Sequence, residues 1–170
     1  ASAAFTDNSP ICVISVDTTT GNNRIIWNKP STNVIDSFVV YRETTVAGEF
    51  APIATLPYNS MTAYTDNEAS PQIKSWKYAI GVIDSCGQRS DLSPIHKSIH
   101  LTINKGISNS WNLIWDGYEG FNVSTYYIWR EAESQGWKLI DSVAGNAFSY
   151  TDIAPAFNTK NYQVEAISPQ

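Results

Sequence analysis

Residues 38–43 read Phe-Val-Val-Tyr-Arg-Glu, and residues 126–131 read Tyr-Tyr-Ile-Trp-Arg-Glu, so one alternating pattern returns 88 positions later. Side chains at alternate positions line one face of an extended strand, which makes both stretches candidate strands. Other landmarks recur in the same order: residues 25–27 at 113–115, residues 64–66 at 150–152, and residues 78–82 at 162–166. Four matches in one order predict two tandem copies of a single architecture within the 170 residues.

Short hydrophobic or alternating runs lie between closely spaced turn signals along the chain. Five of them are predicted strands: Arg24–Trp27, Ser37–Arg42, Ala51–Leu56, Trp76–Ile83 and Lys97–Ile103. No segment holds the i, i+3, i+4, i+7 pattern long enough for a helix. Many short strands with regular turns predict an all-β protein, either a sandwich or a barrel.

Three features resemble fibronectin type III domains: a tryptophan in each second strand, an aromatic-rich third strand that ends in arginine, and a tyrosine in each sixth strand. The stretch from Val82 to Ile103 is similar to modules of Bacteroidetes surface and secreted proteins. The resemblance implies two tandem immunoglobulin-like β-sandwiches. It places an N-terminal tail at 1–9, a full module at 10–100, and a second module at 101–170 that lacks its last strand.

The arrangement predicts a stiff junction and one open sheet edge. The last strand of the first module is expected near 95–101 and to run almost directly into the next module, because no Gly/Ser-rich linker intervenes. The final strand of the second module, near 162–167, would have a free edge, and such an edge invites pairing with another chain.

Alternation predicts which side chains form the two cores. Trp27 and Trp115 are expected between the sheets, where each would bury a large apolar surface. Tyr78 and Tyr162 match the family's buried tyrosine, whose hydroxyl would bond nearby backbone. Other inward residues are expected to be Phe38, Val40, Tyr126, Ile128, Trp76, Ile80 and Val82.

Two cysteines, Cys12 and Cys86, are too far apart in sequence for a local metal motif. If the first strand starts near Ile11, both lie at the same pole of the first module. We therefore expect a disulfide, which would suit an oxidising compartment; two unpaired thiols are the alternative.

Catalytic and metal-binding patterns are weak. His96 and His100 lie four apart in a predicted strand and are expected to face solvent, without the nucleophile and orienting carboxylate of a triad. Residues 66–68 and the acidic residues Asp84 and Asp91 lack calcium-loop spacing and are expected to bond their own turns. We expect no catalytic residue, metal or cofactor, and a glycoside-active enzyme fragment is only a remote third alternative.

Outward-facing aromatic residues are the remaining candidate site. Tyr41 on the first copy and Tyr127 and Trp129 on the second alternate with inward residues, and Trp137 is expected in or after the following loop. Flat aromatic rings stack against sugars, so these four residues are candidates for binding a glycan or a surface protein. The alternative is that neighbouring side chains cover them, since single exposed aromatics are common.

A net charge of −5 and the absence of a basic stripe argue against a nucleic-acid partner. No apolar run approaches the roughly 18 residues of a membrane span. The resemblance implies a non-catalytic spacer or presentation role in a larger extracellular or cell-surface bacterial protein. Its expected partners are other domains of the same polypeptide, and the aromatic binding module is the alternative function.

Overall fold

The computed structural model describes residues 9–32, 34–132, 136–155, 159 and 161–169. Within these ranges the chain forms thirteen strands and no helix. It divides into two compact units, Ala1–Ser98 and Ile99–Gln170. The predicted N-terminal tail lies outside the described residues except for Ser9, which is buried.

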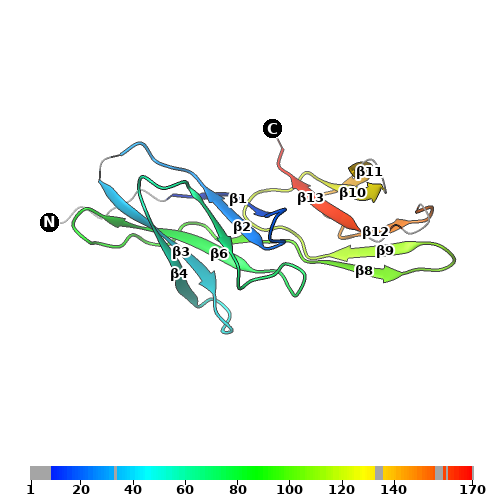
Figure 1. Ribbon diagram of the computed structural model, residues 1–170, viewed down its shortest axis with the longest axis horizontal. Coiled ribbons are helices and arrows are strands. Elements are labelled where there is room, and N and C mark those ends of the chain that lie inside the picture. The colour runs from blue at the N-terminus through cyan, green and yellow to red at the C-terminus, as the bar shows by residue number, and fades with distance from the viewer. Residues whose placement is uncertain (1–8, 33, 133–135, 156–158, 160, 170) are drawn as a thin grey trace. The chain divides into compact units, whose positions relative to one another are not determined.

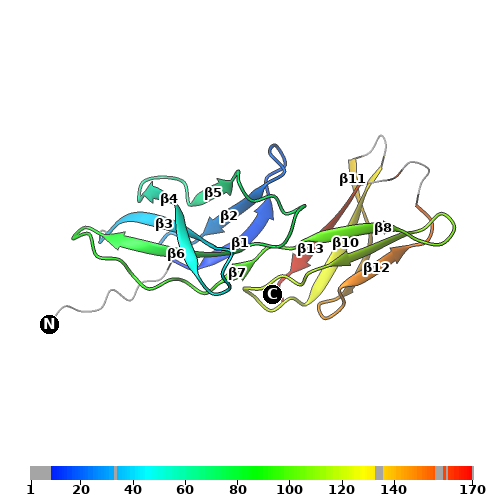
Figure 2. The ribbon, with the colours of Figure 1, turned by 90° about the horizontal axis from the view of Figure 1, so that it is seen from below.

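Unit 1 contains two antiparallel sheets (Figures 1 and 2). The first has the order β1-β2-β5: β1 (Ile11–Val16), β2 (Asn23–Trp27) and β5 (Ala63–Asp66). The second has the order β4-β3-β6-β7: β4 (Phe50–Pro57), β3 (Ile35–Glu43), β6 (Lys77–Asp84) and β7 (His96–Lys97).

Unit 2 repeats this plan. Its first sheet has the order β12-β9-β8: β12 (Ser149–Asp152), β9 (Trp111–Trp115) and β8 (Leu101–Lys105). Its second sheet has the order β11-β10-β13: β11 (Gly136–Ala144), β10 (Thr125–Ala132) and β13 (Tyr162–Ile167). The described residues of unit 2 contain no counterpart of β7.

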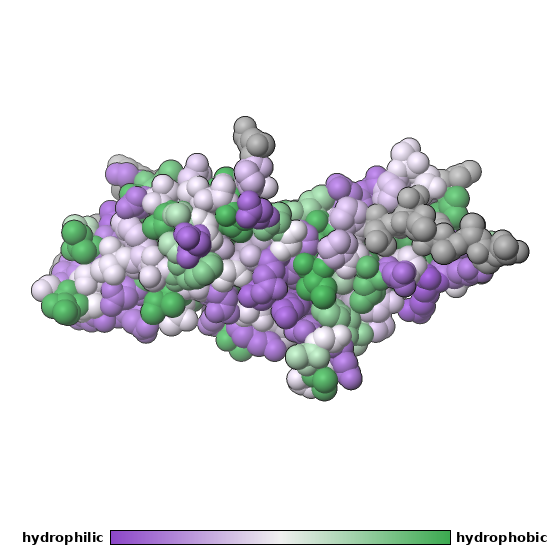
Figure 3. Space-filling view, turned by 180° about the vertical axis from the view of Figure 1, so that it is seen from behind, coloured by the Kyte–Doolittle hydropathy of each residue, from purple (hydrophilic) through white to green (hydrophobic). Residues whose placement is uncertain are grey.

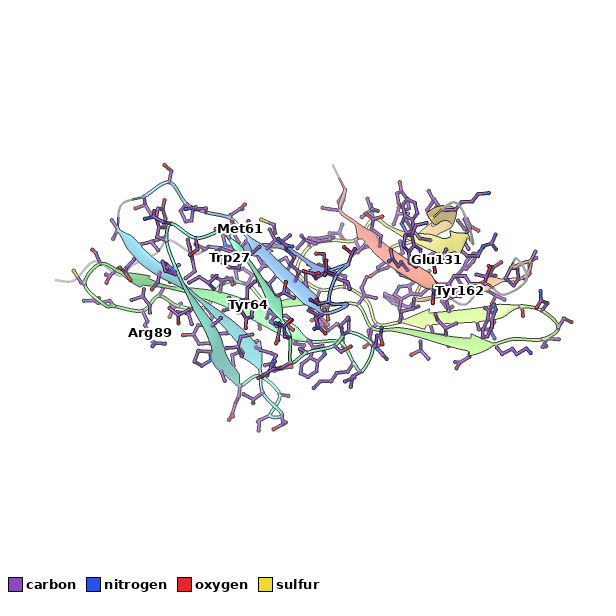
Figure 4. All side chains as sticks on the ribbon, in the orientation of Figure 1. Trp27, Met61, Tyr64, Arg89, Glu131 and Tyr162 are labelled. Carbon is purple, nitrogen blue, oxygen red and sulfur yellow. The ribbon has the colours of Figure 1, made fainter. Side chains whose placement is uncertain are left out.

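In each unit the sheets face one another across an aromatic core. Trp27 of β2 lies 5.7 Å from Phe38 of β3 between ring centroids (Figure 4), and Trp115 of β9 lies 5.5 Å from Tyr126 of β10. All four side chains are almost fully buried, as alternation predicted. The predicted all-β fold of two β-sandwiches is confirmed, and the described residues of unit 2 include no strand after β13.

Two details of the strand prediction are wrong. The strand predicted at Lys97–Ile103 is two strands in different units, because β7 ends at Lys97 and β8 begins at Leu101. Trp76 was expected in the inward row of β6 but precedes that strand. Its indole Nε1 donates to the Ser70 carbonyl at 2.9 Å, and its ring packs against the Arg42 guanidinium.

Candidate functional site

Two aromatic side chains of β10 face away from the core of unit 2. Tyr126 and Ile128 point inward and are buried, so the alternate residues Tyr127 and Trp129 lie on the outer face, where both are half-buried. The sequence prediction for their direction therefore agrees with the structure.

Strand β11 adds two exposed hydrophobic side chains to the same face. Trp129 pairs with Leu139, and Glu131 pairs with Trp137, because a bulge at Ile128/Trp129 shifts the register. Trp137 is 41% exposed and Leu139 is 42% exposed. Trp137 lies within β11, the strand that follows β10, which agrees with the expected position in or after the loop between them. We call Tyr127, Trp129, Trp137 and Leu139 the aromatic surface.

Strand β13 supplies a carboxylate that holds one ring of the aromatic surface. The Trp129 indole Nε1 donates to Glu165 Oε2 at 2.9 Å, and Glu165 stands opposite Tyr127 in the strand register. Glu131, which accepts a hydrogen bond from Asn161, is the cross-strand neighbour of Trp137. Each tryptophan of this surface therefore has an exposed carboxylate beside it.

In unit 1 the counterpart of Trp129 is Tyr41, which is likewise half-buried but contacts different neighbours. Its hydroxyl accepts a hydrogen bond from Arg89 Nη1 at 3.1 Å (Figure 4 labels Arg89). Its ring lies close over Gly81, where an added Cβ would be 3.0 Å from the ring and 3.6 Å from Leu92. Tyr41 is therefore engaged within its own unit and does not join the aromatic surface, which belongs to unit 2.

On the face drawn in Figure 3, hydrophobic residues are scattered. The face in Figure 3 shows them in small groups separated by hydrophilic residues. Scattered exposure of this kind is ordinary for a folded protein and does not mark a second site.

A buried ionic cluster, which the sequence analysis missed, joins the two sheets of each unit. In unit 1 Asp66 of β5 accepts hydrogen bonds from Arg42 of β3 at 2.8 and 2.9 Å and from the Tyr78 hydroxyl of β6 at 3.0 Å. The family resemblance implied a backbone acceptor for this hydroxyl, and that expectation is wrong. The aspartate that recurs in the Tyr-Thr-Asp repeat was the sequence signal that could have revealed this cluster.

Unit 2 repeats the cluster with Asp152 of β12. This carboxylate accepts from Arg130 Nη1 at 2.7 Å and from the Tyr162 hydroxyl at 2.9 Å (Figure 4). Burial, together with the neighbouring carboxylate, raises the pKa of Tyr78 and of Tyr162 far above the ordinary value of a tyrosine. Both hydroxyls therefore remain protonated donors, and the clusters have a structural role.

Comparison with known proteins gives only distant structural similarity. No protein-family model and no curated protein sequence matches the chain. The chicken interferon gamma receptor alpha chain is similar over 96% of this chain and 100% of its own, at 13% identity and a TM-score of 0.41. The FN1–FN3 domains of chicken CNTN1 are similar over 96% of this chain and 62% of their own, at 14% identity and a TM-score of 0.35.

The predicted disulfide is not present in the structure, which has Cys12 and Cys86 as exposed free thiols. The Cys12 thiol in β1 donates to Asn28 Oδ1 at 3.0 Å, at the start of the loop between β2 and β3. Cys86 follows β6, in the other sheet, and its neighbour Ser85 bonds Val34 at the far end of that loop. Cys12 thus lies in one sheet beside the start of this loop, and Cys86 lies in the turn after a strand of the other sheet, beside the end of the loop.

The two histidines also differ from expectation. His96 was expected to face solvent, but it is only 4% exposed, and burial lowers its pKa. His100 belongs to unit 2 and is half-buried, so the two do not share one strand. Asp66 and Asp84 do bond their own turns, since they accept from the amides of Glu68 and Cys86.

Within the described ranges, no group of three or more His, Cys, Asp or Glu side chains is placed to hold a metal ion. The same residues include no helix that is long and apolar enough to cross a membrane. The aromatic surface is therefore the candidate site that the side-chain geometry supports best.

Proposed function

We propose that this chain is a pair of non-catalytic modules that spaces and presents other domains of a larger extracellular or cell-surface protein. The junction between the units carries this proposal. The Ser98 amide donates to the Trp76 carbonyl at 2.9 Å within unit 1, and the Asp116 amide donates to the His100 carbonyl at 3.1 Å within unit 2. Ile99 is the single residue between these two anchored positions.

A junction of one free residue limits the independence of the units. A flexible linker gains reach roughly as the square root of its length, so one residue gives very little. A spacer needs this property, because a loose tether would not hold its neighbours at a set separation. The buried ionic clusters suit the same role, since each ties together the two sheets of its unit.

Nuclear spin relaxation of the amides in each unit tests the spacer function. We expect both units to report one shared rotational correlation time in the intact chain. Inserting a Gly-Ser-Gly-Ser segment after Ile99 should separate the two values and leave each unit folded. Different correlation times in the unmodified chain would contradict the proposal, because they would show that the junction is already flexible.

The aromatic surface supports binding of a glycan as a second function. Three rings of unit 2 share one outer face, and carboxylates beside the two tryptophans offer acceptors for sugar hydroxyl groups. Stacking of a pyranose ring on an indole buries apolar area on both partners. A surface protein is the alternative ligand.

Affinity electrophoresis against a panel of polysaccharides tests this second function. Retardation of the intact chain should be lost in Trp129→Ala and in Trp137→Ala. Tyr41→Ala is the matched control, because Tyr41 occupies the equivalent strand position in unit 1 and should leave retardation unchanged. Equal retardation of all four proteins would exclude the aromatic surface as the site.

A further inference from the structure

The outer face of the sheet β11-β10-β13 carries two carboxylates beside its tryptophans. Glu131 lies two residues beyond Trp129 on β10, so both point to the same face, and Glu165 of β13 accepts the hydrogen bond of the Trp129 indole (Figure 4 labels Glu131). Lys138 of β11 stands opposite Arg130, whose side chain points into the ionic cluster of unit 2, so this lysine belongs to the inner face. Within the described ranges, no lysine or arginine forms an ion pair with either carboxylate.

Unit 1 balances the charge at the matching position. Glu43 of β3 is the counterpart of Glu131, and it pairs with Lys77 of β6 at 3.8 Å between Oε1 and Nζ. Asn161 of unit 2 holds the place of Lys77, directly before the tyrosine of the ionic cluster, and its neutral amide donates to Glu131. Unit 2 therefore keeps the carboxylate of this pair and has a neutral side chain in place of the cation.

Glu165 adds a second difference of the same sign. It corresponds by strand register to Gly81 of unit 1, because they stand opposite the matching residues Tyr127 and Val39. A glycine projects neither a side chain nor a charge from this position. Compared with unit 1, the outer face of unit 2 thus lacks one positive charge and has one more negative charge. The net charge of −5 on the chain favours the approach of a cation in the same way.

The rings of the aromatic surface are also available to a cation. In unit 1 the ring of Trp76 has Lys74 Nζ 4.2 Å and the Arg42 guanidinium carbon 5.4 Å from its centroid. In the described part of unit 2, no lysine, arginine or second ring packs on the ring of Trp129 or of Trp137. The face of an indole attracts a cation through its ring quadrupole. A cationic ligand would therefore meet indole faces and carboxylates together.

From these features we infer that the aromatic surface binds a glycan built of amino sugars, with its protonated amino groups on Glu131 and Glu165. The inference rests on the glycan-binding function proposed above. An ammonium group donates charge-assisted hydrogen bonds to a carboxylate, and these are about twice as strong as those of a neutral hydroxyl. The pyranose rings supply a flat apolar face that can stack on Trp129 and Trp137, which a lysine side chain does not offer.

Two glycans that differ only in the charge on nitrogen test the inference. A glucosamine hexamer and an N-acetylglucosamine hexamer are titrated into the ¹⁵N-labelled chain, in mildly acidic buffer that protonates the amino groups. The glucosamine hexamer should shift the indole signals of Trp129 and Trp137 saturably and leave those of the buried Trp27 and Trp115 unchanged. The acetylated hexamer should bind about fivefold more weakly. Added salt should weaken only the glucosamine hexamer, because salt screens exposed charges.

Three variants remove the charge balance without touching the core. Asn161→Lys restores the lysine that pairs with the carboxylate in unit 1, and it should weaken the glucosamine hexamer by about fivefold. Asn161→Gln keeps a neutral amide and is the matched control. Glu131→Gln and Glu165→Gln should each cause a similar loss. The second of these keeps an oxygen acceptor for the Trp129 indole, so its effect reports the charge and not the position of the ring.

The outcomes separate this inference from the function on which it rests. Equal binding of the two hexamers would overturn the amino-sugar inference and leave glycan binding in place. Binding of neither hexamer, together with no retardation by any polysaccharide, would overturn both. Equal affinity of Asn161→Lys and Asn161→Gln would show that the carboxylates do not select the ligand. Oligolysine bound as tightly as the glucosamine hexamer would also overturn the inference, because the ligand would then be a basic peptide.

Discussion

Replacement of Asp66 by asparagine should lower the free energy of unfolding of unit 1 by about 3 kcal/mol. Asp66 is 2% exposed and accepts hydrogen bonds from Arg42, from the Tyr78 hydroxyl and from the Glu68 amide. Asparagine removes the charge and turns one acceptor oxygen into a donor, so the donors of Arg42, Tyr78 and Glu68 can no longer all be satisfied.

The size of this loss in stability follows from the Arg42 charge that the substitution leaves without its main partner. Breaking a buried ion pair by removing one partner costs about 3–5 kcal/mol, because the remaining charge is buried and unpaired. The Arg42 side chain is 19% exposed, so water can partly hydrate it. This partial hydration favours the lower end of the range. Glu68, which also pairs with Arg42, is 82% exposed. Glu68→Gln should therefore change stability by less than about 1 kcal/mol.

Hydrogen exchange read separately over the two units is the measurement. Asp66→Asn should speed exchange throughout unit 1 and leave unit 2 unchanged, and Asp152→Asn should do the reverse. Urea denaturation supplies the free energies, with Glu68→Gln as the matched control. If Asp66→Asn and Glu68→Gln proved equally mild, the buried cluster would not stabilise the sandwich and the reasoning would fail.

Three other outcomes are expected. Burial lowers the pKa of His96, so the folded state favours the neutral ring. Stability is therefore full above the unfolded-state pKa of 6.5 and falls as the pH drops below it. Urea midpoints measured between about pH 7 and pH 5 should show this dependence, and His96→Gln should remove it. Alkylation of the folded chain should modify both Cys12 and Cys86 without a reductant, and a reductant should leave the intact mass unchanged. Gly145→Ala should destabilise unit 2 by roughly 2 kcal/mol or more in thermal unfolding, because the new Cβ would lie 1.9 Å from the Val123 carbonyl oxygen. Unchanged stability would contradict this contact.

Local patterns predicted most of the strands and their inward faces. Alternation in residues 38–43 and 126–131 placed Phe38, Val40, Tyr126 and Ile128 in the cores, because one side of each strand is apolar in both copies. Val39 shows the limit of this reasoning. It alternates outward, yet it is 2% exposed. Whether an outward residue is covered depends on tertiary packing that alternation does not encode.

The break between β7 and β8 could not be read from the sequence. Residues 97–103 contain no glycine or proline, and their side chains fit an uninterrupted strand. The break arises because Ser98 bonds Trp76 and His100 bonds Asp116, and both partners are distant in sequence. Long-range main-chain pairing of this kind overrides local preference.

The candidate site was only partly predictable for a related reason. The outward direction of Tyr127 and Trp129 follows from their own strand, but the positions of Trp137 and Leu139 depend on β11 and its bulge. Without the register, no sequence signal joins Leu139 to Trp129. The burial of His96 likewise depends on the place of β7 in the assembled sheet and not on its neighbours in the sequence.

The ionic cluster has a consequence for how the two copies have diverged. Arginine, aspartate and tyrosine occupy matching positions in both units. The outer faces differ, because Val39, Tyr41 and Gly81 of unit 1 correspond to Tyr127, Trp129 and Glu165 of unit 2. Because interior side chains hold the two sheets together, the outer face can change without loss of the architecture. A duplicated sandwich of this kind can keep one copy for support while the other acquires a new surface.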